Sequence, residues 1–218
     1  MKVYVTREIP PFAVSLMEEA GITVSAWSEK RDLTPDELIK YSKENEALLS
    51  VGPNKINAAF LKECAHLKVI SLLSVGYDQV DIPEATRLKI PVGNTPDVLS
   101  NATADVAFLL MLAASRKAFY MHKKIISGDW GFYEPMVNVG MELHGKTLGV
   151  WGLGKIGLEM AKRCAGAYKM KIIYCNRNSN PLAENEINAV RVSFSELLSQ
   201  SDVLSVHTGL TDETKGKF

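Results

Sequence analysis

The sequence has few of the features that mark secreted, membrane-bound or nucleic-acid-binding proteins. Only three of its 218 residues are cysteines, Cys64, Cys164 and Cys175, and their spacing matches no metal-binding motif. Its 25 basic and 25 acidic residues balance, so the net charge favours neither nucleic acid nor an anionic membrane as a partner. Sparse, scattered cysteines are typical of a reducing compartment, and we expect a cytoplasmic protein without a metal site.

Long apolar runs are also missing. The longest, residues 106–114, is about half the length of roughly 18–20 residues that a membrane-spanning helix needs. Residues 1–10 contain no apolar segment of the signal-peptide type and instead predict a strand. We therefore expect no membrane partner and no cleaved leader.

The first hundred residues alternate short β-rich runs with helical patterns. We predict strands at residues 2–6, 22–27, 47–51 and 69–75, and helices at 10–20, 34–41 and 56–64. Thr34, Pro35 and Glu37 form a capping-box pattern at the start of the second helix. The strand at 69–75 is apolar or small throughout, as in a strand buried on both faces. This alternation predicts a parallel α/β sheet.

The pattern changes after residue 100. Residues 102–116 predict a long apolar helix between two lobes, and a second helix follows to about residue 127. Residues 128–145 form a loop rich in glycine and aromatics, and loops of this length are often functional or contact a partner. A second α/β run has predicted strands at 147–152, 171–175 and 202–207, with helices at 155–165 and 194–199. Because a doubly wound dinucleotide domain has about six strands, this second lobe is expected to be incomplete.

A G-x-G-x-x-G motif joins the first strand and helix of this second run. Gly152 would allow the tight turn, Gly154 would let phosphates approach, and Gly157 would let helix and strand pack closely. The helix start, with Lys155 and Ile156, would offer N–H donors and a positive dipole to a pyrophosphate. Placed between a strand and a helix, the motif predicts dinucleotide binding.

The turn after the next strand contains no carboxylate. An NAD site usually has Asp or Glu there, whereas this chain has residues 176–180, Asn-Arg-Asn-Ser-Asn. Arg177 lies twenty residues past Gly157 and would pair with a 2′-phosphate, with Asn178 and Ser179 as neutral donors. The alternative is a solvated arginine in a polar turn. Because a carboxylate would repel the phosphate, its absence favours NADP (NADPH) over NAD.

Three segments follow one another along the chain: SVGYDQVD (74–81), NTPDVLSNATADVAFLLMLAASR (94–116) and GLGKIG (152–157). Together they resemble the D-2-hydroxyacid dehydrogenase family, and within it the glyoxylate/hydroxypyruvate reductases, over residues 1–218. The resemblance implies a flavodoxin-like substrate lobe at 1–98. An incomplete Rossmann dinucleotide-binding lobe at 99–218 would follow, both lobes having parallel sheets. It also implies a homodimer formed through an arm at about 119–145.

The resemblance also implies roles for further residues. The loop with Val75 and Gly76 would bind the substrate carboxylate through main-chain N–H groups. Thr103 would lie by the cofactor, and Thr208 and Gly209, in the loop 208–211, would run beside it. Tyr133 stands in the arm where some glyoxylate reductases use an aromatic to cap the neighbour's pocket. Thr103 as a simple helix-start hydroxyl and the arm aromatics as interface anchors alone stay open as alternatives.

The family's catalytic Arg, Glu and His belong to its last third, and we expect them beyond Phe218. The four histidines present, His66, His122, His144 and His207, match none of these positions and are expected to be structural or solvated. The implied function of the full-length protein is NADPH-dependent reduction of a small 2-keto acid, glyoxylate or hydroxypyruvate, to the 2-hydroxy acid. The 218-residue chain alone is expected to be inactive.

Two alternatives stay open at this point. One keeps the chemistry and changes the substrate, to phosphoglycerate, phosphite or another 2-keto acid. The other is a non-catalytic, dinucleotide-sensing protein like the corepressors of the same fold family.

Overall fold

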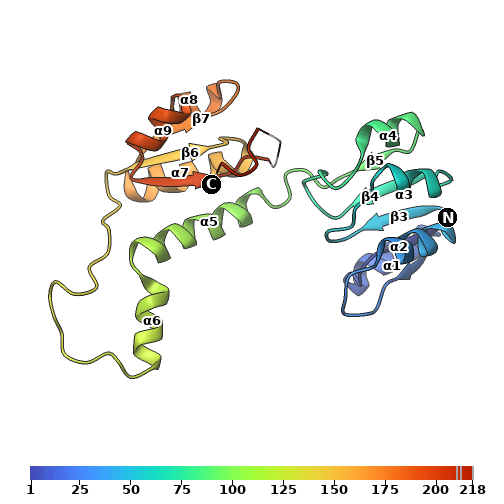
Figure 1. The fold of residues 1–218 in the computed structure, drawn as a ribbon, viewed down its shortest axis with the longest axis horizontal. Helices are drawn as coiled ribbons and strands as arrows, with labels where there is room; N and C mark the ends of the chain where they lie inside the picture. The colour runs from blue at the N-terminus through green and yellow to red at the C-terminus, as the bar shows by residue number, and fades with distance from the viewer. Residues whose placement is uncertain (210, 212, 218) are drawn as a thin grey trace. The chain divides into compact units, whose positions relative to one another are not determined.

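The computed structural model describes residues 1–209, 211 and 213–217. The chain divides into two compact units, Met1–Val98 and Leu99–Phe218, and each contains a parallel β-sheet (Figure 1). Within the predicted cofactor loop 208–211, Leu210 lies outside the described residues. The α/β fold with parallel sheets is as predicted.

The first unit has a five-stranded sheet in the order β2-β1-β3-β4-β5, with parallel pairing throughout. Its elements are β1 (Lys2–Val5), α1 (Pro11–Glu19), β2 (Thr23–Ala26), α2 (Pro35–Lys43), β3 (Ala47–Ser50), α3 (Ala58–Glu63), β4 (Val69–Leu72), α4 (Ile82–Arg87) and β5 (Val92–Gly93). The capping box of α2 is formed: Glu37 N donates to Thr34 Oγ1 at 3.3 Å, and Thr34 N donates to Glu37 Oε2 at 2.9 Å.

Three details of the first unit differ from the prediction. The helix predicted from residue 56 begins at Ala58, because Asn57 Oδ1 accepts the N–H of Phe60 at 3.0 Å and caps it. The strand predicted at 69–75 ends at Leu72, and Ser71 is exposed between two buried neighbours, so the prediction that both faces are buried was wrong. The prediction missed the short elements α4 and β5, and β5 has only two residues, too few to show a periodicity.

The second unit has a sheet in the order β8-β7-β6-β9, also parallel throughout. Its elements are α5 (Ser100–Ser115), α6 (Ala118–Ile126), β6 (Thr147–Trp151), α7 (Lys155–Tyr168), β7 (Lys171–Cys175), α8 (Pro181–Ile187), β8 (Val190–Arg191), α9 (Phe194–Gln200) and β9 (Val203–Val206). The prediction of three strands was wrong, since the described residues form four. The fourth, β8, is only two residues long and gives no sequence signal of its own.

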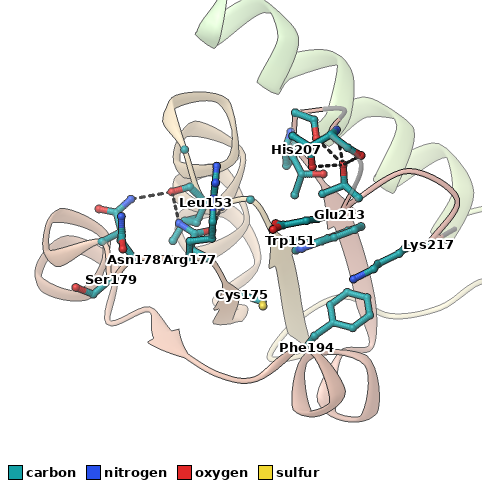
Figure 2. Close-up of a pocket in the computed structure, with 18 of the residues that line it drawn as sticks. Trp151, Leu153, Cys175, Arg177, Asn178, Ser179, Phe194, His207, Glu213 and Lys217 are labelled. Atoms are coloured by element: carbon teal, nitrogen blue, oxygen red, sulfur yellow. Dashed lines mark hydrogen bonds between the residues drawn. The ribbon is translucent and has the colours of Figure 1, made fainter. Parts of the chain in front are cut away.

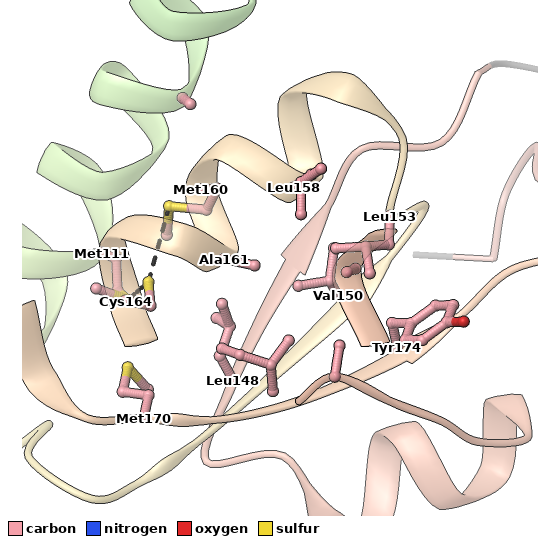
Figure 3. Packing of buried hydrophobic residues seen from close by; sticks show 14 of the residues in the cluster. Met111, Leu148, Val150, Leu153, Leu158, Met160, Ala161, Cys164, Met170 and Tyr174 are labelled. Atoms are coloured by element: carbon pink, nitrogen blue, oxygen red, sulfur yellow. Dashed lines mark hydrogen bonds between the residues drawn. The ribbon is translucent and has the colours of Figure 1, made fainter. Parts of the chain in front are cut away.

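The core of the second unit lies between the sheet and the helices α5 and α7. Met111 of α5 meets Cys164 of α7 (Figure 3), with Cys164 Sγ at 3.8 Å from Met111 Sδ and, within α7, at 4.0 Å from Met160 Sδ. Burial raises the pKa of the Cys164 thiol to about 12, so this cysteine packs as a small apolar side chain.

The other face of α5 is exposed within the described structure. Val106, Leu109 and Leu110 each keep more than half of their surface accessible. The sequence predicts a helix too apolar for solvent on all sides, and the structure buries only the face that meets α7. No helix among the described residues is long and apolar enough to cross a membrane.

Two glycines of α7 give a matched test of this packing. An ideal Cβ on Gly157 would lie 2.6 Å from the carbonyl oxygen of Gly152, whereas one on Gly166 would meet nothing within 4 Å. We expect Gly157→Ala to destabilise the protein by about 1–3 kcal/mol, because backbone must shift to admit the methyl group. Gly166→Ala should stabilise it by about 0.5–1 kcal/mol, because alanine is the better helix former. Urea unfolding of both variants checks this, and equal effects would contradict it.

Candidate cofactor site

The carboxyl ends of β6, β7 and β9 border a cavity of about 710 Å³ (Figure 2). Ligands of α/β proteins bind at this edge of a parallel sheet, because the loops that follow the strands converge there. The cavity is lined by residues 151–154, 175–181, Phe194, 207–209, Thr211, Glu213, Thr214 and Lys217. In Figure 2, Arg177, Asn178 and Ser179 lie on the side of Leu153, and His207, Glu213 and Lys217 lie on the other.

The three glycines of the motif have different structural roles. Gly152 has φ +94°, and its Cβ would lie 2.7 Å from the carbonyl carbon of His207, so only glycine fits the turn. Gly157 leaves room for the backbone of that turn. Gly154 has φ −89° and ψ −157°, which any residue adopts, and a Cβ there would meet nothing within 4 Å. The fold therefore requires Gly152 and Gly157, whereas Gly154 leaves open space beside the cavity.

The N-terminus of α7 borders the same cavity. The helix begins directly after Gly154 and runs for 14 residues. The first N–H groups of a helix have no acceptor within it, and the helix dipole adds partial positive charge at this end. Together with the space at Gly154, these donors suit a pyrophosphate.

Two asparagines bind the glycine loop to the turn after β7. Asn176 Oδ1 accepts the N–H of Leu153 at 2.7 Å, and Asn176 Nδ2 donates to the Leu153 carbonyl at 3.1 Å. Asn180 Nδ2 donates to the same carbonyl at 2.9 Å. No sequence motif indicated a role for either side chain, although Asn176 follows directly on a strand end, which is where site residues of such sheets lie.

The turn at residues 176–180 has no carboxylate of its own, and the nearest one in sequence is engaged elsewhere. Tyr174 donates its hydroxyl to Glu184 Oε1 at 2.5 Å and accepts the N–H of Asn180 at 2.8 Å. Burial, and then the bond to Glu184, raises the pKa of Tyr174, so the hydroxyl stays protonated and keeps Glu184 bound.

Arg177, Asn178 and Ser179 are exposed and line the cavity. Within the part of the chain that the structure describes, no hydrogen bond or ion pair holds the side chain of any of them. Their donors are therefore available to a ligand.

Thr208 and Gly209 line the cavity from the loop after β9. The Thr214 hydroxyl donates to the carbonyl of Gly209 at 2.8 Å and closes this loop. Beside it, His207 Nε2 lies 2.8 Å from Ser205 Oγ, and burial lowers the pKa of His207. The ring is therefore neutral at pH 7, as a structural histidine would be.

The remaining predicted cofactor residues do not line the cavity. Lys155, Ile156 and Gly157 form the first turn of α7, and Thr103 lies within α5. Among the described residues, no group of three or more His, Cys, Asp or Glu is placed to hold a metal ion.

The predicted substrate loop belongs to the first unit and follows β4. Asn94 Nδ2 donates to the carbonyl of Val75 at 2.8 Å, and Ser74 Oγ donates to the carbonyl of Gly76 at 2.7 Å. Among the described residues no acceptor takes the N–H groups of Val75 and Gly76. Such free main-chain donors suit a carboxylate.

A parallel sheet, a glycine turn without room for side chains and a helix N-terminus at a cavity define the second unit as a Rossmann-type dinucleotide-binding domain. The sequence model of the D-isomer specific 2-hydroxyacid dehydrogenase NAD-binding domain matches residues 108–218. The chain belongs to the D-isomer specific 2-hydroxyacid dehydrogenase family, as the three segments had indicated, and its cofactor is a nicotinamide dinucleotide.

Similar proteins align with nearly the whole chain. The glyoxylate reductase of Thermococcus litoralis is 40% identical, over 98% of this chain and 65% of its own length. The glyoxylate reductase of Pyrococcus furiosus is 37% identical, over 98% of this chain and 64% of its own. A solved structure from Thermus thermophilus superposes with a TM-score of 0.90 at 36% identity, over 98% of this chain and 67% of its own. The chain thus spans about 65% of the length of the curated relative first named.

Neighbouring asparagines give a matched test of how the glycine loop is held. Asn176→Ala removes both hydrogen bonds to Leu153, and we expect it to cost about 1–3 kcal/mol of stability, because the part-buried N–H of Leu153 loses its acceptor. Asn178→Ala removes no side-chain hydrogen bond among the described residues and should change stability by less than about 0.5 kcal/mol. Thermal unfolding of the two variants compares them. Equal stabilities would show that Asn176 does not hold the loop.

Proposed function

We propose that the full-length protein reduces a small 2-keto acid, glyoxylate or hydroxypyruvate, to the 2-hydroxy acid with NADPH. The observation that carries the proposal is the alignment of 98% of the chain with glyoxylate reductases. The solved structure of a glyoxylate reductase from Paecilomyes thermophila, with a TM-score of 0.82 at 30% identity, supports the same assignment.

The choice of NADPH over NADH rests on the charges of the turn after β7. Arg177 is exposed at the cavity and has no ion-pair partner among the described residues. Glu184, the nearest carboxylate in sequence, accepts the hydroxyl of Tyr174 and forms no ion pair with Arg177 among the described residues. A 2′-phosphate would meet a guanidinium and two neutral polar side chains there, and charge-assisted bonds of this kind are strong.

The remaining roles follow the same assignment. The glycine loop and the first turn of α7, with Lys155, Ile156 and Gly157, hold the pyrophosphate. Thr208, Gly209 and Thr103 lie along the cofactor. The N–H groups of Val75 and Gly76 hold the substrate carboxylate.

Bound NADPH supplies the hydride, and the carbonyl oxygen of the substrate must receive a proton. We assign that proton donor to none of the four histidines of this chain. His66 Nε2 lies 3.0 Å from the carbonyl oxygen of Asn45, and His207 is held neutral beside Ser205. The 218-residue chain by itself therefore binds the cofactor without efficient turnover.

The arm at about 119–145 serves as the contact of a homodimer. It exposes large apolar side chains, among them Phe119, Trp130, Phe132 and Tyr133, each more than half accessible. Clusters of exposed aromatic residues are typical of protein interfaces.

The location in a reducing cytoplasm, which we expect from the sparse cysteines, stays a prediction.

The cofactor choice is tested by removing the charge of Arg177. We expect Arg177→Met to raise the Kd for NADPH about 10–100-fold, since a charge-assisted bond contributes roughly 1.5–3 kcal/mol. The Kd for NADH should change less than about threefold, because NADH has no 2′-phosphate. Nicotinamide fluorescence titrations measure both constants. Arg116→Met is the matched control: Arg116 is exposed in the same unit and does not line the cavity. A wild-type protein that binds NADH as tightly as NADPH would refute the choice.

The reaction is tested by following NADPH oxidation with glyoxylate and with hydroxypyruvate. We expect turnover by the full-length protein and a rate at least about 10²-fold lower for the 218-residue chain, because a positioned proton donor contributes that much. Phosphorylated keto acids serve as competing substrates in the same assay. Phosphite is tested by NADP+ reduction instead, because its oxidation to phosphate delivers a hydride to the nicotinamide. Faster turnover of one of these would replace the proposed substrate. Comparable rates for the two chains would show that a residue of the shorter one supplies the proton.

A further inference from the structure

Arg191 forms a contact with the turn after β7 that the proposed function does not use. It lies in β8, opposite Tyr174 of β7. Its Nη2 donates to the carbonyl oxygen of Asn176 at 3.0 Å and to that of Arg177 at 2.5 Å. No carboxylate of the described chain forms an ion pair with it. One guanidinium nitrogen thus donates hydrogen bonds to two successive carbonyl oxygens.

This contact determines which backbone groups of the turn are available to a ligand. The peptide bonds of the described chain are trans, so each N–H points opposite to the carbonyl of its own peptide plane. With the carbonyls of Asn176 and Arg177 directed at Arg191, the N–H groups of Arg177 and Asn178 are directed away from it. Neither N–H donates to an acceptor in the described residues. The turn therefore has its acceptors occupied and its donors free.

Charge leads to the same result. Carbonyl oxygens carry partial negative charge and would repel a phosphate brought close to them. Arg191 binds these two oxygens from β8 and adds a second positive charge beside that of Arg177. The turn at residues 176–180 contains no carboxylate to balance these charges.

We propose that Arg191 is a positioning residue for the 2′-phosphate of NADPH. It holds the carbonyls of Asn176 and Arg177 so that the N–H groups of Arg177 and Asn178, and the side chain of Arg177, are presented to the phosphate. The proposal rests on the proposed preference for NADPH and extends it to a residue that lies outside the cavity lining.

The experiment compares NADPH and NADH binding to the full-length protein and to Arg191→Met. Methionine keeps an unbranched stem and removes the charge and the donors. We expect the Kd for NADPH to rise at least about tenfold and the Kd for NADH to change less than about threefold. The preference for NADPH, measured as the Kd for NADH divided by the Kd for NADPH, therefore falls. Binding of 2′,5′-ADP and of 5′-AMP should show the same contrast without the nicotinamide. If Arg191 only stabilises the edge strand, Arg191→Met will weaken the binding of all four ligands equally, and this result would overturn the proposal. Arg116→Met serves again as the control, and thermal unfolding checks that each variant is folded.

A double-mutant cycle of Arg191→Met and Arg177→Met tests whether Arg191 acts through the turn after β7. If it does, Arg191→Met has a smaller effect on the Kd for NADPH when Arg177 is already methionine, by at least about threefold. The same effect in both backgrounds would mean that Arg191 contributes only a distant charge and would overturn the positioning role. A wild-type protein that does not prefer NADPH would overturn the proposed cofactor and this inference together. A wild-type preference that survives in Arg191→Met would overturn this inference alone.

Discussion

The second unit depends on the close approach of α7 to the turn after β6, and of that turn to the loop after β9. At Gly152 and Gly157 the backbones leave no space for a Cβ atom. This closeness directs the N-terminus of α7 to the cavity, and the packing of Met111 of α5 on Cys164 holds the other side of the helix. Because a close-packed interior resists deformation, the N–H donors at the cavity are held in place before any ligand binds.

The loops that form the proposed site share one feature: their carbonyl oxygens are bound by side-chain hydrogen-bond donors. In each, side-chain donors take up carbonyl oxygens: Asn94 and Ser74 in the substrate loop, Arg191 in the turn after β7, and Thr214 in the loop after β9. In the first two loops main-chain N–H groups are left without acceptors among the described residues. A carboxylate, a pyrophosphate and a 2′-phosphate are all anions, so loops of this construction suit a 2-keto acid and NADPH.

Most of the regular fold could be predicted from the sequence, because long elements carry a period and a cap. The capping box of α2 and the strand β7 were predicted correctly. The short elements α4, β5, α8 and β8 were missed, and two of them, β5 and β8, have only two residues each, too few to show a period. Because β8 was not predicted, the sequence did not place Arg191 beside the turn after β7. Its proposed role depends on its position in this edge strand.

By itself, the sequence determined the glycine spacing, the turn without a carboxylate and the family. These are local properties, since a motif of six residues or the charge of one turn needs no partner elsewhere in the chain. Only the tertiary structure decided that Asn176 and Asn180 bind Leu153, across 23 and 27 positions, and that Arg191 binds the carbonyl of Arg177, across 14. Those contacts exist because the strand order β8-β7-β6 brings three separate strand ends to one edge of the sheet. A side chain's partner across a sheet is set by strand order and register, which single-sequence patterns do not encode.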